Sequence, residues 1–194
     1  MSLEDWSRPL GPDESVLSCV DDADLAERSG DGVVVHAASG DVYRGLGEPV
    51  RHRVTTAVTL DLIDCRVDRG RFRAAAHVLC RPVGALSKWT GPITLVMVSG
   101  HIGRYEAAPR AHPGDGLLDL VEVSDEMTLR QRWMALRRSR TGAHLPHPHI
   151  SMTRVRDLRR SYEQPMQVVI DGRPVGVTTH LDVAVVAAAY EFAV

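Results

Sequence analysis

The sequence predicts a mainly β protein, a β-sandwich of many short antiparallel strands with one or two helices. Apolar, β-branched runs recur at short intervals and are separated by Gly, Pro, Asp or Ser, which is typical of an all-β domain. Only one longer segment has the period of an amphipathic helix. With 194 residues, 44% of them hydrophobic, the chain is long enough to bury a sizeable core.

The N-terminal segment differs from the rest in charge. The first 31 residues contain nine acids and two arginines, so their net charge is 2 − 9 = −7. Pro9, Gly11 and Pro12 interrupt any regular pattern there. We therefore expect residues 1–31 to form an acidic, irregular lead-in with one short helix near Asp21–Glu27. Residues 32–194 are expected to form the β-sandwich domain.

The strands of this domain are predicted from alternation and from turn residues. Val54–Leu62 alternates in the manner of a half-buried strand, and Ile93–Gly100 is apolar enough to be buried on both faces. The pair Asp171-Gly172 is a strong hairpin signal. The predicted strands cover residues 33–36, 54–62, 65–72, 75–80, 93–100, 116–123, 150–155, 166–170, 175–179 and 181–186, with a last one running to residue 192.

One helix is predicted after residue 123. Ser124 or Asp125 is its expected N-cap, and Thr141-Gly142 is expected to end it. One of its faces is apolar and the other is basic. The apolar face consists of Leu129, Trp133 and Leu136, and the basic face of Arg130, Arg137 and Arg138.

Basic residues are concentrated in and after this helix. Residues 126–160 hold nine Arg against Glu126 and Asp157, a net charge of 9 − 2 = +7, although the whole chain carries only −2. Such a segment can contact an anionic membrane surface, a phosphate or a nucleic acid. The alternative is a solvated face paired with the acidic start of the chain. We expect peripheral membrane contact and no nucleic-acid partner.

The cysteines and the missing motifs exclude several classes of protein. The three cysteines, Cys19, Cys65 and Cys80, are odd in number and widely spaced, which favours reduced thiols in a cytoplasmic protein. No glycine-rich phosphate-binding motif is visible, so no nucleotide cofactor is expected. His144, His147 and His149 are separated by prolines, which makes poor chelate geometry and indicates a surface loop rather than a metal site.

A loop that leads into a predicted strand is the best candidate for a metal site. Gly114 and Gly116 flank Asp115, so backbone carbonyls can point inwards beside its carboxylate. Hard cations such as Mg²⁺ or Ca²⁺ prefer such oxygen ligands. A plain Asp-Gly turn is the alternative interpretation.

The loop APRAHPGDGLLDLVEV resembles the proline–alanine–aspartate–glycine–leucine–leucine–aspartate signature of bacterial diacylglycerol and lipid kinases, the family shared with sphingosine kinases within the NAD kinase superfamily. The order of elements is also similar, from the buried strand at residues 93–99 through the loop, the helix and His147-Pro148 to the hairpin QVVIDGRPVG. The resemblance covers residues 54–194 and concerns the C-terminal domain of those enzymes.

The resemblance implies a β-sandwich that packs against a nucleotide-binding domain and contributes to a lipid pocket. It also implies a structural Mg²⁺ in the glycine-flanked loop. The implied ligands are the Asp115 carboxylate and the backbone carbonyls of His112 and Leu117.

The departures from the family pattern bear on catalysis. The family's Gly-Gly-Asp-Gly-Thr loop does not occur in this sequence, and its asparagine–glycine pair appears as Ser99-Gly100. The family's general-base glutamate follows the hairpin's Asp-Gly, a position occupied here by Arg173. A guanidinium is permanently protonated and has no acceptor lone pair, so it cannot take a proton from an alcohol.

Several functions are compatible with these departures. We expect a lipid-kinase-like domain that is not catalytic by itself and binds a lipid, an anionic head group near Arg173 and Asp171, or a separate nucleotide-binding subunit. One alternative is a regulatory or scaffold protein that uses its Arg-rich face for protein or nucleic-acid contact. Another is a fragment or subunit of an ATP-dependent lipid kinase.

Overall fold

The computed structural model describes residues 6–30, 32–50, 54–84, 86 and 89–194. Residues 1–5 and 31 of the expected lead-in lie outside this range. The elements are β1 (Ser7–Pro9), β2 (Val16–Cys19), α1 (Asp22–Arg28), β3 (Val34–Ala37), α2 (Asp41–Gly45), β4 (Thr56–Val67), β5 (Gly70–Ala74), β6 (His77–Pro82), β7 (Ile93–Met97), β8 (His101–Ile102), β9 (Tyr105–Glu106), β10 (Leu118–Val123), α3 (Leu129–Arg138), a 3-10 turn (Ser139–Thr141), β11 (Ile150–Val155), β12 (Asp157–Ile170) and β13 (Arg173–Ala193).

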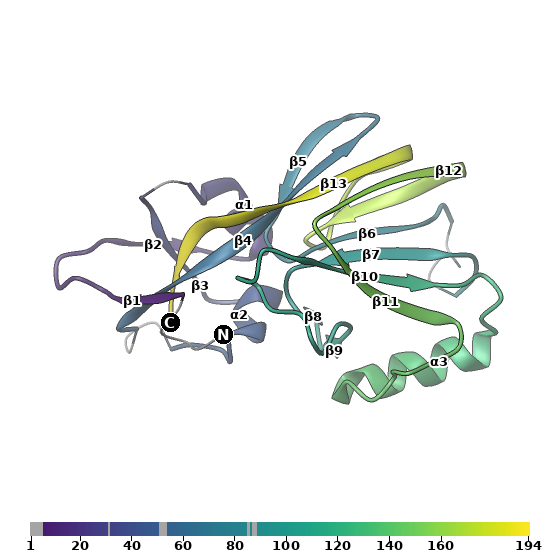
Figure 1. Cartoon of the computed structure of the whole chain (residues 1–194), viewed down its shortest axis with the longest axis horizontal. Coiled ribbons are helices and arrows are strands. Elements are labelled where there is room, and N and C mark those ends of the chain that lie inside the picture. The colour runs from purple at the N-terminus through teal and green to yellow at the C-terminus, as the bar shows by residue number, and fades with distance from the viewer. Residues whose placement is uncertain (1–5, 31, 51–53, 85, 87–88) are drawn as a thin grey trace.

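The predicted fold class is confirmed. Eleven of the described strands form one large sheet in the order β1-β4-β13-β12-β6-β7-β10-β11, with β5 beside β4, and this path is antiparallel throughout. The sheet curls over, so that β4, β5 and β13 form one layer and β6, β7, β10 and β11 form the other (Figure 1). The main core fills the space between the layers and includes Ile63, Val96, Leu118, Val168 and Leu181.

Two long strands, β12 and β13, link the layers. The boundaries predicted for β13 are wrong. The strands expected at 175–179, 181–186 and up to 192 are one 21-residue strand, β13. Its pairing with β4 shifts register between Val186 and Tyr190, where Ala188 has a φ of 51°. A bulge bends a strand without ending it, so no turn residue marks the change of direction. In contrast, the strand predicted over 65–72 is split by a turn between Val67 and Gly70.

The expected irregular lead-in contains two short strands, β1 and β2. The helix predicted near Asp21–Glu27 is present as α1, but β2 precedes it and pairs in parallel with β3, which in turn pairs with the end of β13. Leu25 is fully buried in a second core with Val35, Leu60 and Phe192. Residues 16–45 are therefore an integral β-α-β-α part of the fold, at the end opposite α3 (Figure 1).

Helix α3 is present, but its cap and its orientation differ from the prediction. Thr128 caps it in a capping box with Gln131. Arg132 and Ala135 face inwards, whereas Leu129 and Trp133 of the predicted apolar face are 60% and 54% exposed. Among the described residues, no helix is long and apolar enough to span a bilayer.

Candidate functional site

The hairpin between β12 and β13 is anchored by Asp171. This residue has a φ of 45°, a conformation that Asp tolerates better than most side chains. Its two carboxylate oxygens accept N–H bonds from Ala75 (2.7 Å), Ala76 (3.0 Å) and His77 (2.9 Å). Burial raises the pKa of Asp171, and the charge of His77 opposes that shift. Asp171 therefore fixes the β5–β6 connection to the hairpin.

Arg173 points from the same hairpin to helix α1. Its Nη2 donates to both oxygens of Asp21 at 3.1 Å, and its Nη1 lies 3.7 Å from a carboxylate oxygen of Glu27. The side chain is 53% exposed. A head group at Arg173 would have to compete with these two carboxylates. Ligand binding by Arg173 and Asp171 stays a prediction.

A hollow of about 340 Å³ opens beside Arg173, between α1, β5 and the hairpin. Its lining is mixed in character, because charged side chains alternate with apolar ones. The lining residues are Ala23, Ala26, Glu27, Phe72, Arg73, Ile170, Arg173 and Val175.

Behind the hairpin, buried acids join the N-terminal unit to the sandwich. Asp22 accepts the N–H groups of Asp41 and Val42, the first residues of α2. Burial, together with the negative charges of Asp171 and Asp41, raises the pKa of Asp22 to about 6. Asp41 in turn lies 3.4 Å from Nδ1 of buried His77. Burial lowers the pKa of His77, but Asp41 and the other carboxylates outweigh it and the net shift is upward.

These buried acids were not predicted from the sequence, although a glycine beside them is a signal for close packing. Gly40 directly precedes Asp41, and a side chain at residue 40 would collide with the Asp22 carboxylate.

The same acids also affect anion binding. The N-termini of α1 and α2 are already capped by the carboxylates of Asp21 and Asp22. A phosphate approaching either end would meet these negative charges.

The loop predicted to hold a metal ion surrounds Asp115. One oxygen of Asp115 accepts the N–H of Leu117 at 3.1 Å, and the other lies 3.4 Å from Nη1 of Arg154. His112 accepts the N–H of Gly114 through Nδ1 (3.2 Å). Burial raises the pKa of Asp61 and of Asp119, and the negative charge of nearby Asp115 adds to both shifts.

The residues of this loop fit a weakly held hard cation in type, since they offer a carboxylate and carbonyls. Within the described range, no group of three or more acidic, His or Cys side chains is suited to holding a metal ion. Arg154 already provides positive charge to Asp115 and, at 3.5 Å, to Asp119.

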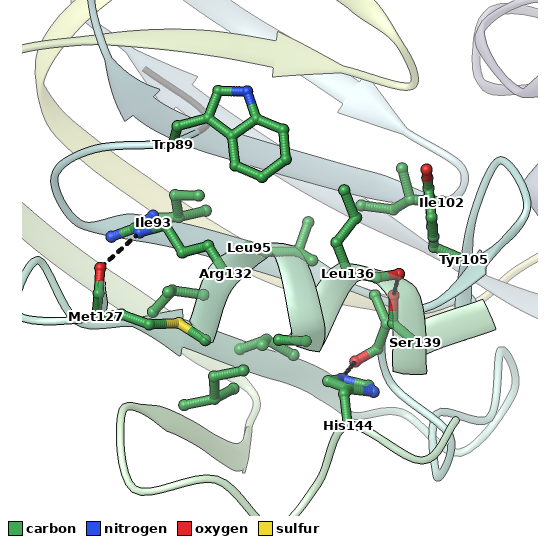
Figure 2. Close-up of a pocket in the computed structure, with 15 residues that line it drawn as sticks. Trp89, Ile93, Leu95, Ile102, Tyr105, Met127, Arg132, Leu136, Ser139 and His144 are labelled. Carbon is green, nitrogen blue, oxygen red and sulfur yellow. Dashed lines mark hydrogen bonds between the residues drawn. The ribbon is translucent and has the colours of Figure 1, made fainter. Parts of the chain in front are cut away.

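An apolar hollow lies elsewhere, between α3 and the outer face of β7, β10 and β11. It has a volume of about 360 Å³. Figure 2 shows Ile93 and Met127 at one end, and Ile102 and Tyr105 at the other. It is lined by Trp89, Ile93, Leu95, Ile102, Tyr105, Ala107, Val121, Val123, Met127, Arg132, Ala135, Leu136, Ser139, His144 and Ile150.

The polar side chains of this cavity make hydrogen bonds to the backbone, but Arg132 Nη1 and His144 Nδ1 are buried without a hydrogen-bond partner among the described residues. Arg132 donates to the carbonyls of Met127 (3.1 Å) and Ser124 (2.8 Å), which holds the start of α3 against the sheet. A ring nitrogen of His144 lies 3.2 Å from the Ala107 carbonyl, and burial lowers the pKa of His144, so the imidazole is neutral at pH 7. Apart from these two nitrogens, the cavity wall is mostly hydrocarbon.

The curled antiparallel sheet and its Asp-Gly hairpin define the class of β-sandwich domains. The chain belongs to the family of the YegS C-terminal NAD kinase beta sandwich-like domain, whose model matches residues 70–191, more than half of its length. No curated protein matches the chain.

Solved structures with the same fold include proteins from Bacillus anthracis str. Sterne that are assigned as diacylglycerol kinases. One aligns with a TM-score of 0.63 at 12% identity, over 91% of this chain and 76% of that chain. A second aligns with a TM-score of 0.56 at 12% identity, over 82% and 66%. At this identity, the likeness shows the shared fold.

The structural match also extends further than the predicted resemblance. Residues 54–194 are 194 − 53 = 141 residues, or 73% of the chain, whereas the first alignment covers 91%. Part of the first 53 residues, which the sequence resemblance left unplaced, therefore shares the fold of the kinase structure.

Proposed function

We propose that this chain is a lipid-binding relative of the lipid kinases that does not transfer phosphate by itself. Two features support the proposal: the apolar cavity beneath α3, and an arginine at the position where the family has its general base. The cavity is the observation that carries the binding function. Its volume of about 360 Å³ falls within the range of roughly 300–1,000 Å³ typical of small-molecule sites.

The cavity suits an acyl chain better than a polar metabolite. A polar ligand would lose its hydrogen bonds to water against a hydrocarbon wall, and each unmade bond is costly. A methylene chain would instead gain about 0.8 kcal/mol for each buried CH₂ group. Leu95 and Val121 come from the sheet and Leu136 from α3, so a chain would be enclosed between two elements.

The neighbourhood of Arg173 supports the absence of catalysis. The guanidinium is held by Asp21 and Glu27, and it offers only donors. A substrate hydroxyl placed beside it would find no acceptor on residue 173, and the nearby carboxylates of Asp21 and Glu27 are already engaged with the guanidinium. The acids at the N-terminus of α1 would in addition repel the phosphates of ATP.

Co-purification tests the lipid-binding proposal. We expect organic extraction and mass spectrometry of the purified protein to yield an acyl lipid. Ala135→Trp should lower its amount at least about tenfold, because Ala135 faces the cavity and the indole would fill it. Leu129→Trp, on the exposed side of the same helix, is the matched control and should keep the lipid. An empty wild-type protein, or equal lipid in both variants of comparable thermal stability, would contradict the proposal.

We also propose that the loop around Asp115 holds a structural Mg²⁺ with millimolar affinity, with the carbonyls of His112 and Leu117 as further ligands. At ten times Kd, such an ion would stabilise the fold by about 1.4 kcal/mol, or about 3 °C in Tm. Asp115→Ala should abolish this rise, whereas Asp125→Ala, an exposed acid in another loop, should keep it. Thermal unfolding with and without Mg²⁺ measures the effect, and equal responses of wild type and Asp115→Ala would refute the site.

A further inference from the structure

A second hollow lies beside the apolar cavity, at the C-terminal end of α3. This second hollow has a volume of about 250 Å³. Tyr105 and Leu136 line both hollows, so they form a shared wall. The remaining lining residues of the second hollow are Trp133, Arg137 and Arg140. A chain buried under α3 would have its head at this outer hollow if its end passed Tyr105 and Leu136.

The outer hollow is cationic and aromatic. The Arg137 guanidinium lies 5.7 Å from the centre of the Trp133 ring, and the Arg104 guanidinium lies 5.5 Å from that of Tyr105. Arg104 and, more weakly, Arg140 lower the pKa of the Tyr105 hydroxyl, which places positive charge at the cavity mouth.

These positive charges are not neutralised by ion pairs with the acids that the structure describes. In the described part of the chain, neither Arg104, Arg137 nor Arg140 forms an ion pair with a carboxylate. Glu106 is the acid of the same hairpin, and its carboxylate lies against the backbone of Gly142. By contrast, Arg154 and Arg160 on the neighbouring strands do pair with acids.

The chemistry of the two hollows limits what can fill both. A hydrocarbon cavity selects an apolar chain, and paired guanidinium groups select a planar or tetrahedral oxyanion, to which they can donate two bonds each. An uncharged lipid would leave the arginines unused, and a small anion would leave the cavity unused. A ligand that matches both hollows is an anionic amphiphile.

We propose that the cavity binds a single-chain amphiphile with a carboxylate or phosphate head, its chain lying under α3 and its head between Arg137 and Arg140. This inference rests on the proposed lipid-binding function and adds the class of ligand and its orientation. It places the head group at the C-terminal end of α3. The hollow beside Arg173 has no lining residue in common with either of these two.

Titration with probes of equal chain length tests the inference. Dodecyl phosphate and dodecanoate carry anionic heads, and monododecanoylglycerol is their neutral counterpart. At low ionic strength we expect the anionic probes to bind about tenfold more tightly than the neutral one. This preference should shrink at about 0.5 M salt, because exposed charges are then screened beyond a few ångströms.

Paired arginine variants locate the head group. Arg137→Gln combined with Arg140→Gln should remove the preference for anionic probes and leave binding of the neutral probe unchanged. Arg130→Gln combined with Arg138→Gln removes the same charge from the same helix but leaves the hollow's lining intact, so the preference should persist. Loss of the preference in both pairs, or in neither, would overturn the proposed head-group position.

The outcomes separate this inference from the proposed function. If no probe binds, the lipid-binding function itself fails. If anionic and neutral probes bind equally well to the wild type, only the inference fails.

Vesicles of phosphatidylcholine with and without phosphatidylglycerol identify the source of the ligand. Retention on anionic vesicles, lost in the Arg137/Arg140 variant, would indicate a membrane lipid. Binding of monomeric dodecyl phosphate alone would indicate a soluble amphiphile, and both results agree with the proposed site.

Discussion

The purified chain, given ATP, Mg²⁺ and diacylglycerol or a sphingoid base, is expected to form no phosphorylated lipid. General-base assistance is typically worth 10²–10⁴-fold in rate, and Arg173 cannot provide it because its guanidinium has no acceptor. Its guanidinium is also engaged in ion pairs with Asp21 and Glu27. Radiolabelled ATP with lipid in mixed micelles measures the transfer directly.

Two substitutions at this position make the test specific. Arg173→Glu restores the family's residue type, yet we expect no turnover, because its carboxylate would face Asp21 and Glu27 and the acids at α1 would still repel phosphate. Arg173→Gln removes the charge without reversing it and serves as the control for stability. Phosphate transfer by the wild type would contradict the non-catalytic assignment. Transfer by Arg173→Glu alone would show that Arg173 was the single block.

Local chemistry explains which parts of the fold could be predicted from the sequence. The hairpin at Asp171-Gly172 and the strand after Gly116 have turn residues beside apolar alternation, and both occur as predicted. The 21 residues of β13 were divided too finely, since a bulge near Ala188 leaves the same local pattern as a strand end.

The candidate site was less predictable because it depends on contacts between distant segments. Asp22 and Asp41 become buried partners of the hairpin only once β2 and β3 have joined the end of β13. The cavity under α3 likewise requires the helix to present Ala135 and Arg132 to the sheet, while Leu129 and Trp133 of its more apolar face stay exposed. Periodicity identified an amphipathic helix but could not determine which face packs.

Asp171→Ala is expected to cause the largest loss of stability of any substitution considered. Three backbone N–H groups, of Ala75, Ala76 and His77, would lose their acceptor, and an unsatisfied donor in a partly buried site costs about 1–3 kcal/mol. Alanine would also be strained at a φ of 45°. The sum is several kcal/mol, against a total stability of roughly 5–15 kcal/mol for a typical domain.

Urea unfolding at pH 7 measures this loss, with Asp68→Ala as the matched control. Asp68 lies at an exposed position in the turn of the neighbouring β4–β5 hairpin. Its carboxylate accepts one backbone hydrogen bond, from the N–H of Thr179 at 2.9 Å. Its replacement should cost much less than that of Asp171, because solvent can replace the lost bond at an exposed position. If Asp171→Ala were no more damaging than Asp68→Ala, the bonds of Asp171 would not be what holds the β5–β6 connection.

Asp171→Asn separates the hydrogen bonds of Asp171 from its charge. Asn tolerates the left-handed conformation and keeps one acceptor oxygen, so Asp171→Asn should lower the free energy of unfolding less than Asp171→Ala does.

The stability loss caused by Asp171→Asn should depend on pH. The pKa of Asp171 is raised in the folded state, so the contribution of its titration to stability is fully present below the unfolded pKa and is lost as pH rises through the folded pKa. The Asn side chain does not titrate, so the variant lacks this pH-dependent contribution. The loss caused by Asp171→Asn should therefore be larger at pH 5 than at pH 8. The raised pKa of His77 acts in the same direction, since part of it comes from the charge of Asp171. A loss that grows with pH would mean that three N–H donors stabilise the ionised carboxylate more than burial disfavours it.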